Sequence, residues 1–466
     1  NFTVRDVFAN QNPEALAKTA VNVIDVNVEN TWPENGLVPA LPIYLDMLET
    51  SNSLERFNQA VCLQVPETIT FEQVESALTR LQEHHAALRL RASGLGKNTQ
   101  FIIDPSEDCP PPKLDTLDLS IYGESGSEEI LESHFNELSL RLSPEQPGGM
   151  VVPLWVNRKD QSPLLIIVIH HFSVDGVSWR ILIEDLITLT SGTSDVLLSP
   201  TMSLRAWGEH IAEAGQKGLR RTEEPLWLKQ LHNARPLPQD HPVSVSQNTL
   251  GSSKIVEGIL DLNSTEKLLR APIIYRANAN EIMLTAIGMA LCDWCTVQYN
   301  YELGDPLIAL EGHGRESDVD LTQTVGWFTS LFPIRLEVSD LDLKSNDNPG
   351  YGIRRIKECL RSFPNKGIGY GILKHYDPES ALSSDNLNRP QILFNYLGRF
   401  EQTNKNPGDW QFAEFGLSSS LDDDNRRREY LIEINAIIDQ TGQLKFNIIY
   451  CPFAHSESSM TAFART

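Results

Sequence analysis

The stretch LLIIVIHHFSVDG, residues 164–176, decides how the fold of this chain is interpreted. It opens with an unbroken apolar run, residues 164–169, rich in β-branched side chains, which is typical of a strand buried on both faces. His170 and His171 end this run. Because neighbouring side chains of a strand point to opposite faces, only one histidine can face a given cavity, and the other must find a hydrogen-bond partner in the interior. The pattern alone leaves catalytic and structural interpretations of the pair open.

Asp175 and Gly176 follow the histidines, and Asp175 has two interpretations. It could be a second acid–base group, or it could fold back onto an arginine and fix the turn. Gly176 supplies freedom for a turn, which favours the structural role. We expect Arg335 to be the partner of Asp175. A helix is predicted to follow from Ser178, with Ser178 itself as the N-cap.

Elsewhere, apolar periodicity predicts strands and helices in alternation in both halves of the chain. Alternation repeated after a polar stretch near residues 215–225 predicts two α/β lobes rather than one continuous sheet. The expected elements are a strand at 59–65, a helix from 71 to 81, a strand at 255–260, a helix at 281–294, a strand at 306–310, and a hairpin of 431–438 and 444–450 around the turn 439–442.

Two further clusters could carry chemistry. Glu311 stands in EGHGRE, residues 311–316, where a strand is expected to leave the core, and partial burial would raise its pKa towards a useful range. The alternative is an exposed turn in which Arg315 pairs with the next residue. Asn395 and Tyr396, in FNYLG, could present an amide and a phenol to a cavity, although aromatic-rich strands are usually core.

The composition excludes several classes of protein. The net charge is −23, from 39 Lys and Arg against 62 Asp and Glu, and such a surface repels nucleic acid and anionic lipid. The basic run at residues 426–428 lies beside the acidic run 422–424 and is interpreted as a solvated loop. We expect no membrane-spanning run and no secretory signal at the start of the sequence.

The remaining candidate ligands are interpreted as structural. The six cysteines are scattered, and Cys292 and Cys295 fall in an apolar helical pattern without further ligands, so no metal site is expected. The pair His84–His85 is not followed by an Asp-Gly and is taken as structural. These features together indicate a reduced, cytoplasmic location.

Several segments together resemble one family. HHxxxDG at residues 170–176 resembles the active-site motif of condensation-type domains of nonribosomal peptide synthetases. Its continuation through Ser178 and Trp179 resembles the epimerization branch of that family. EGHGRE at 311–316, VGWFT at 325–329 and FNYLG at 394–398 are similar to epimerization-domain motifs, in the same order. One departure is PIYLD, residues 42–46, where the family usually has glutamines after Pro-Ile.

This resemblance implies an α/β fold of two chloramphenicol-acetyltransferase-like lobes, a V-shaped pseudo-dimer with a central channel. It further implies four segments along the chain. These are the end of a carrier domain at 1–20, a linker at 21–36, an N-terminal lobe at 37–218 and a C-terminal lobe at 219–466.

The resemblance implies a cofactor-independent isomerase that inverts Cα of an aminoacyl or peptidyl thioester, carried on the 4′-phosphopantetheine of an upstream carrier domain. His171 and Glu311 would be the two acid–base groups, and which of them deprotonates the L-form stays open. Supporting roles would fall to His170, Ser178, Trp179, Asn395 and Tyr396, with Asp175, Gly176 and Arg335 structural. A downstream module is expected as a further partner, and the isolated domain is expected to be monomeric. The alternatives are a condensation domain, which would not need Glu311, and a domain that only docks carriers.

Overall fold

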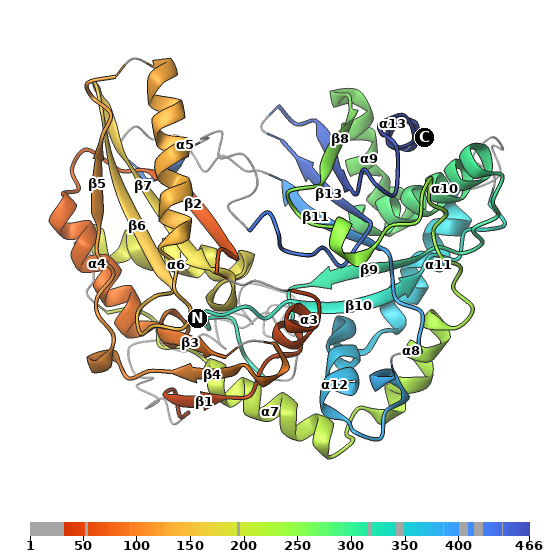
Figure 1. Cartoon of the computed structure of the whole chain (residues 1–466), viewed down its shortest axis with the longest axis horizontal. Coiled ribbons are helices and arrows are strands. Elements are labelled where there is room, and N and C mark those ends of the chain that lie inside the picture. Colours follow the sequence, from red (N-terminus) through yellow and green to blue (C-terminus); the bar gives the residue numbers. More distant parts are fainter. Residues whose placement is uncertain are drawn as a thin grey trace, which may run out of the picture. The chain divides into compact units, whose positions relative to one another are not determined.

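The computed structural model describes most of the chain from residue 32 onwards (Figure 1). By their internal contacts, residues 34–466 form one compact unit. The expected carrier tail, 1–20, and most of the expected linker, 21–36, lie outside the described residues. The described ranges are 32–51, 55–94, 96–122, 124–192, 196–315, 319–341, 349–384, 386–399, 409–413, 423–439 and 441–466.

The first half of the chain builds most of a five-stranded sheet with the order β12-β2-β7-β6-β5. Its central strand β7 runs antiparallel to both neighbours, and β5 runs parallel to β6. A second sheet has the order β1-β4-β3. The strands are β1 (Gly36–Val38), β2 (Asn58–Gln64), β3 (Leu90–Ser93), β4 (Gln100–Ile103), β5 (Asp115–Asp118), β6 (Val151–Arg158) and β7 (Gln161–His170), and the helices are α3 (Pro42–Thr50), α4 (Phe71–His84), α5 (Glu124–Leu140), α6 (Gly176–Thr190) and α7 (Leu204–Gln216).

Strand β7 is buried on both faces, as its apolar run predicts. Leu165, Ile167 and Ile169 belong to one core, which includes side chains of α4 and α6. The alternate residues of β7 belong to a separate cluster with side chains of α5. The two faces of the sheet therefore carry different helices, which can be located in Figure 1. The active-site candidates follow directly at the end of this rigid strand.

The second half builds a six-stranded sheet with the order β10-β9-β11-β13-β14-β8. β11 runs parallel to both β9 and β13, and the other pairs are antiparallel. The predicted hairpin is confirmed as β13 and β14. The strands are β8 (Lys254–Leu260), β9 (Leu307–Gly312), β10 (Ser330–Arg335), β11 (Ile392–Arg399), β12 (Gln411–Phe412), β13 (Ile432–Ile438) and β14 (Leu444–Tyr450), and the helices are α8 (Glu224–Leu231), α9 (Leu262–Tyr275), α10 (Ala279–Tyr299), α11 (Pro349–Ser362), α12 (Ile368–Tyr376) and α13 (Glu457–Arg465).

One face of this sheet is apolar and the other is not. Along β13, Ile432, Ile434 and Ala436 are buried in a core shared with α8, α10 and α13. Glu433 and Asn435 alternate with them and are only half-buried. The half-exposed face therefore carries polar groups, and it is the face of Glu433 that matters for the candidate site.

Segments of the second half pack in the first half, so contacts cross the expected boundary at 218/219. β12 belongs to the second half but pairs antiparallel with β2 in the first sheet. Val325, Trp327 and Phe328 are buried in the core of the first half. The boundary at 218/219 therefore stays a prediction, because residues after it add a strand to the five-stranded sheet and side chains to the core of the first half.

By length and composition alone, helix α10 is long and apolar enough to cross a membrane, with 21 residues and a mean hydropathy of 1.2 over its most apolar window. From the sequence, no run of this kind is expected. In the structure, Leu284, Leu291 and Trp294 of this helix are at most 2% exposed and pack in the core. The helix begins at a capping box in which Asn278 and Glu281 exchange hydrogen bonds. Its packing is that of the central helix of a folded domain.

Asp46 of α3 joins the first half of the chain to α12 of the second. Its Oδ1 atom lies 2.5 Å from Lys374 Nζ and 2.9 Å from His375 Nε2, and Asp46 is 6% exposed. Burial alone would raise the pKa of Asp46, but the hydrogen bonds and charges of His375 and Lys374 outweigh it and lower the pKa. Asp46 lies in the segment after Pro-Ile in which the resemblance leads one to expect glutamines, and in this chain it forms a buried ionic link.

We predict that Asp46→Asn lowers the free energy of unfolding by about 3 kcal/mol at pH 7, because it leaves the mostly buried Lys374 with Glu49 as its one remaining counter-ion among the described residues. Urea denaturation followed by circular dichroism measures this. Because the pKa of Asp46 is lowered from 3.8, the loss should be full above about pH 4 and should shrink as the pH falls below that value. The matched control is Glu209→Gln, which removes a more exposed ion pair with Arg205 and should cost less than about 1 kcal/mol. Equal losses in the two variants would contradict the prediction.

Candidate active site at the end of strand β7

The two histidines at the end of β7 lie in different environments. His170 is the last residue of the strand and is fully buried, and its Nδ1 accepts a hydrogen bond from the Phe172 N–H at 3.3 Å. At His171 the chain turns into a short 3-10 helix, and the His171 side chain is half-buried. The prediction that one histidine sits in the interior with a hydrogen-bond partner is confirmed. His171 is therefore the histidine that reaches open space.

The ring of His171 is held by hydrogen bonds on both nitrogens. Its Nδ1 lies 2.8 Å from the carbonyl oxygen of Val174, which can only accept, so Nδ1 carries the proton. Its Nε2 lies 2.9 Å from Nε2 of Gln59 on β2, whose amide N–H donates to it. The oxygen of the same amide accepts from the Trp179 indole N–H at 2.9 Å. His171 therefore presents a lone pair on Nε2.

Aromatic and charged groups surround His171. The Phe57 ring stacks on it with centroids 4.8 Å apart, and the Trp327 ring lies at 4.4 Å. The guanidinium of Arg426 lies 5.0 Å from the centroid of the Phe57 ring. Burial lowers the pKa of His171 to about 4, with Asp175 opposing and Arg426 adding to the shift. The imidazole is therefore neutral at physiological pH and can act as a base.

Asp175 has the structural role that was expected, but with a different partner. Both of its carboxylate oxygens accept from Arg315 Nη2, at 2.9 and 3.0 Å, and both side chains are at most 7% exposed. Its oxygens also accept from the backbone N–H groups of Ser178, at 2.7 Å, and Phe328, at 3.1 Å. The carboxylate thus ties the end of the first sheet to two segments of the second half.

The expectation for Arg335 was wrong. Its side chain donates to the backbone carbonyls of Gln230 and His232 at the end of helix α8. Arg315 was considered only as the member of an exposed ion pair with the next residue, which lies outside the described residues. Sequence distance is the reason for the error, because Asp175 and Arg315 are 140 residues apart.

Two local expectations beside Asp175 are also corrected. The N-cap of α6 is Asp175 rather than Ser178, because the Asp175 carboxylate accepts from the Ser178 N–H. Gly176 is the first residue of α6, its φ is not positive, and an added Cβ would meet nothing within 4 Å. The Ser178 hydroxyl instead contacts the backbone of Gly326, donating to its carbonyl and accepting from its N–H. Ser178 therefore supports the site by joining the two halves.

Glu311 lies near the end of β9, where its strand leaves the core. Its Oε2 accepts a hydrogen bond from the Asn395 amide at 3.0 Å. Its side chain reaches solvent, yet burial raises its pKa to about 7, and the charge of Glu433 adds to the rise. The two observations are compatible. The exposed fraction describes only which atoms touch solvent, whereas the pKa also depends on the low-dielectric protein that lies around the carboxylate. The raised pKa agrees with the sequence prediction, whereas the expected partial burial of the Glu311 side chain does not.

Asn395 and Tyr396 point to opposite faces of β11. Asn395 faces Glu311, while Tyr396 is partly buried against the core beneath the sheet, on the side of Phe394. The register supports this division, since Tyr396 pairs with the fully buried Ala436. Of the two expected enolate-stabilising residues, the structure brings only Asn395 into contact with Glu311.

The segment from Trp327 to Leu331 links the two candidate acid–base groups. Trp327 lies against His171, and Leu331 of β10 is paired with Glu311 of β9. Four residues of extended chain span at most about 14 Å, so the backbones beside His171 and Glu311 lie in one neighbourhood. Gly314 permits this arrangement, because its φ is +65° and an added Cβ would lie 1.6 Å from the Phe328 carbonyl oxygen.

Four residues of this neighbourhood were missed or misread in the sequence. Gln59 and Phe57 lie in or beside an ordinary-looking strand, and nothing local marks them. Arg426 was placed in a solvated loop, whereas it lies over Phe57, and the adjacent Arg428 is 6% exposed and paired with Glu433 at 2.9 Å. One feature of the sequence could have indicated that Arg428 is paired. The predicted strand that begins a few residues later carries Glu433 on its polar face.

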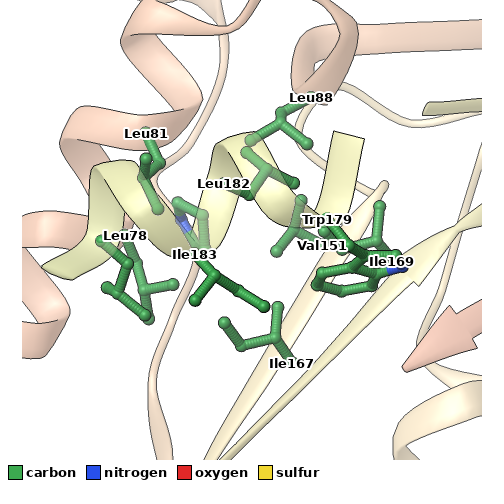
Figure 2. Close-up of a pocket in the computed structure, with 11 residues that line it drawn as sticks. Leu78, Leu81, Leu88, Val151, Ile167, Ile169, Trp179, Leu182 and Ile183 are labelled. Carbon is green, nitrogen blue, oxygen red and sulfur yellow. The ribbon is translucent and has the colours of Figure 1, made fainter. Parts of the chain in front are cut away.

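An apolar cavity adjoins Trp179 but is too small for a ligand. Figure 2 shows its walls, which come mainly from α4, α6, β6 and β7. Its volume of about 20 Å³ leaves room for about one water molecule, and apolar cavities of this kind remain dry. Trp179 thus has one side against the core and its indole N–H against Gln59.

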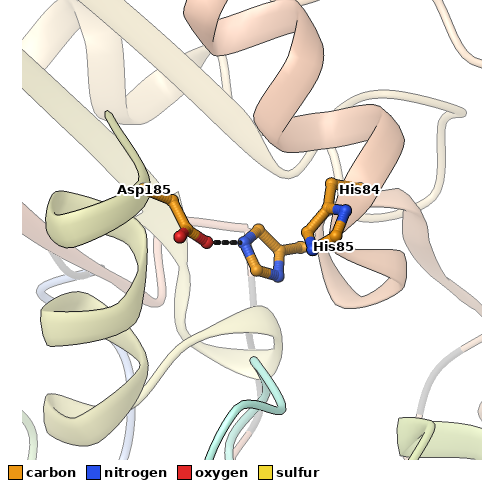
Figure 3. Close-up of side chains that lie close together, drawn as sticks. All are labelled: His84, His85 and Asp185. Carbon is orange, nitrogen blue, oxygen red and sulfur yellow. Dashed lines mark hydrogen bonds and ion pairs between the residues drawn. The ribbon is translucent and has the colours of Figure 1, made fainter. Parts of the chain in front are cut away.

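The other histidine pair, His84 and His85, contacts different residues from those around His171. His85 Nε2 lies 2.8 Å from Asp185 Oδ2, and His84 lies beside them (Figure 3). Their potential ligand atoms lie within 4.8 Å of one another, but they number three, fewer than the four of a structural zinc site. His85 is 2% exposed, which agrees with the structural interpretation. Cys292 and Cys295 are free thiols within α10, as expected from packing.

Comparisons with known proteins agree on one family. A family model described as "Condensation domain" matches residues 44–466. The chain is 32% identical to linear gramicidin synthase subunits C and B of Brevibacillus parabrevis, over its whole length but only 6% and 9% of theirs. Among solved structures, it resembles the epimerization domain from the third module of tyrocidine synthetase B, with a TM-score of 0.79 and 27% identity over 92% of this chain and 95% of that one.

A condensation domain of a polyketide synthase, from the Monacolin K enzyme MokA, gives a TM-score of 0.68 at 16% identity, covering 92% of this chain and 95% of that one. That likeness concerns the fold alone, and together with the two α/β lobes it confirms the predicted fold class. Because the condensation-domain model matches the chain from residue 44 to its last residue, this protein belongs to the condensation-domain family.

Proposed function

We propose that this domain inverts the Cα centre of an aminoacyl or peptidyl thioester during nonribosomal peptide synthesis. The observation that carries the proposal is Glu311, a carboxyl group with its pKa raised to about 7, on the strand paired with the segment that contacts His171. A condensation reaction needs the histidine but has no evident use for this group. The likeness to a solved epimerization domain supports the same choice.

Inversion requires a base on one side of Cα and an acid on the other. In the resting site, His171 is neutral and Glu311 is partly protonated. Substrate first displaces the Gln59 amide N–H from His171 Nε2. His171 Nε2 then takes the Cα proton, the electrons of the C–H bond move into the enolate, and protonated Glu311 delivers its proton to the opposite face. The products on the enzyme are an imidazolium and a carboxylate, which exchange protons with solvent before the next cycle. Which enantiomer presents its proton to His171 is assigned by the isotope experiment below.

The enolate oxygen needs a hydrogen-bond donor where charge develops. Asn395 remains the best candidate, because its amide has a second N–H besides the one that binds Glu311. Tyr396, placed against the core, is a weaker candidate for this role. The thioester itself acidifies Cα, so the proposed steps draw only on side chains of this chain.

The substrate would arrive on the 4′-phosphopantetheine of an upstream carrier domain in the same polypeptide, with no further cofactor. The matched relatives are synthase subunits many times longer than this chain, which fits a carrier before it and a further module after it. We propose a cytoplasmic location and a monomeric isolated domain on the same basis. The channel through which the carrier arm would enter stays a prediction from the family resemblance.

A condensation domain is the rival proposal, and one experiment separates the two. A carrier loaded with an L-aminoacyl thioester is supplied to the chain in deuterated water, and the released acid is analysed for chirality and Cα deuterium. We expect D-product that carries deuterium. His171→Ala and Glu311→Gln should each lower net inversion by about 10²- to 10⁴-fold. A variant that still exchanges deuterium without inverting identifies the face served by the remaining group.

The matched control is Glu302→Gln, an exposed carboxylate ahead of β9, which should retain the wild-type rate. Product that stays L without deuterium would rule out epimerization. Peptide-bond formation on addition of a second loaded carrier would establish the condensation alternative.

The pH dependence of kcat/KM gives a second test. The reactive pair carries one proton in either direction of reaction, so both directions should show the same bell-shaped profile. With the pKa of His171 at about 4 and that of Glu311 at about 7, kcat/KM should be high between these values and fall about tenfold per pH unit above pH 7. Single-turnover rates with L- and D-loaded carrier measure it. A rate that stays constant from neutral to alkaline pH would contradict the role of Glu311 as the acid.

A further inference from the structure

We propose that Gln59 and Trp179 are a positioning pair that fixes His171 in the tautomer protonated on Nδ1, with the Nε2 lone pair held by the Gln59 amide until substrate takes its place. The inference rests on the proposed function in one respect, the identity of the substrate from which His171 takes a proton. Gln59 comes from β2 and Trp179 from α6, so neither belongs to the histidine motif itself. They are positioning residues, because they act through His171 rather than on the substrate.

The direction of each hydrogen bond from Trp179 through Gln59 and His171 to Val174 is determined by the two end groups, the Trp179 indole N–H and the Val174 carbonyl. The Trp179 indole nitrogen can only donate, so the atom facing it at 2.9 Å is the amide oxygen of Gln59. The amide nitrogen must then face His171 Nε2 at 2.9 Å and donate to it. At the other end of the ring, the Val174 carbonyl can only accept from Nδ1. No amide flip and no other tautomer satisfies all three contacts.

The pair is rigid because its outer member is built into the core. Trp179 is 8% exposed and forms part of the wall of the small apolar cavity beneath α6. The backbone of Gln59 is paired with Ile169 of β7, immediately before the two histidines. The amide therefore approaches His171 from a fixed position on the neighbouring strand.

This arrangement opposes protonation of His171 on Nε2. An imidazolium would place an N–H at Nε2 directly against the Gln59 amide N–H, and the amide could turn its oxygen to this N–H only by breaking its bond to Trp179. The other charged groups near the ring are Asp175 of α6, which Arg315 neutralises, and Arg426 beside Phe57, which also disfavours a positive ring. The aromatic neighbours Phe57 and Trp327 bear no charge. The pair therefore keeps His171 a base between turnovers and favours prompt loss of the proton that it has taken.

The competing interpretation is that Gln59 and Trp179 only pack the end of the sheet. The two interpretations differ in their effect on the titration of His171. Gln59→Glu replaces the amide donor by a charged acceptor of the same shape, so the pKa of His171 should rise by about one to three units. Trp179→Phe keeps Gln59 but frees its amide to turn, so the pKa should rise by a smaller amount. Gln64→Glu, at the other end of β2, is the matched control and should change nothing.

The test is long-range ¹H–¹⁵N NMR of the full chain with labelled histidine, with the His171 signals identified by their loss in His171→Gln. In the wild type at pH 7 we expect the proton on Nδ1 and an unprotonated Nε2, and a titration that begins only well below pH 6. This first measurement needs no variant at Gln59 or Trp179, so a folding defect in either does not affect it. Thermal unfolding of each variant confirms that the fold is kept.

The proposal is overturned if wild-type His171 carries its proton on Nε2, or if either Gln59→Glu or Trp179→Phe leaves the His171 pKa at its wild-type value. These readouts are independent of turnover. A chain with the expected tautomer and shifts but without Cα inversion would retain the positioning pair and reject epimerization. A chain that inverts Cα but fails the titration test would reject the pair and retain the function.

Discussion

The buried carboxylate of Asp175 is the contact on which the geometry of the candidate site depends. It accepts four hydrogen bonds, two from Arg315 and one each from the backbone of Ser178 and Phe328. These partners come from the first turn of α6 and from two segments of the second half of the chain. A buried charge is tolerated only when it is paired and fully hydrogen-bonded, so the segments can satisfy Asp175 in one arrangement only. That arrangement holds the turn after β7, and with it His171, beside Trp327.

Burial shifts the pKa values of the two proposed acid–base groups in opposite directions. Removing water disfavours the charged form of any group, which lowers the pKa of an imidazole and raises that of a carboxyl. The same cause therefore brings His171 to a neutral base and Glu311 towards a neutral acid, although one lies at the end of β7 and the other on β9. The site can hold one base and one acid without a buried net charge. The roles follow from position in the fold as much as from residue type.

The sequence predicted the parts of this arrangement that depend on local pattern. The apolar run before His170 predicted β7, and the strand before Glu311 predicted the raised pKa of this carboxyl, although its side chain is exposed rather than partly buried. It failed where the partner is distant, since Arg315 lies 140 residues from Asp175 and Gln59 lies 112 residues from His171. A glutamine in a strand and an arginine in a charged loop have no periodicity that would mark them. The error in the cap of α6 was different in kind, because both Asp175 and Ser178 are good N-caps and the choice depends on where the strand ends.

The unequal exposure of the two groups explains how the pair can return to its resting state. After a turnover by the proposed route, His171 carries an extra proton and Glu311 lacks one. Inside the site, the Gln59 amide and Arg426 both disfavour an imidazolium, so His171 has a strong tendency to release its proton. The Glu311 side chain reaches solvent, and this gives it direct access to water from which it can be reprotonated. A fully enclosed carboxyl would keep its raised pKa but lose that route, so the exposure of Glu311 is a requirement of repeated turnover by a two-base mechanism.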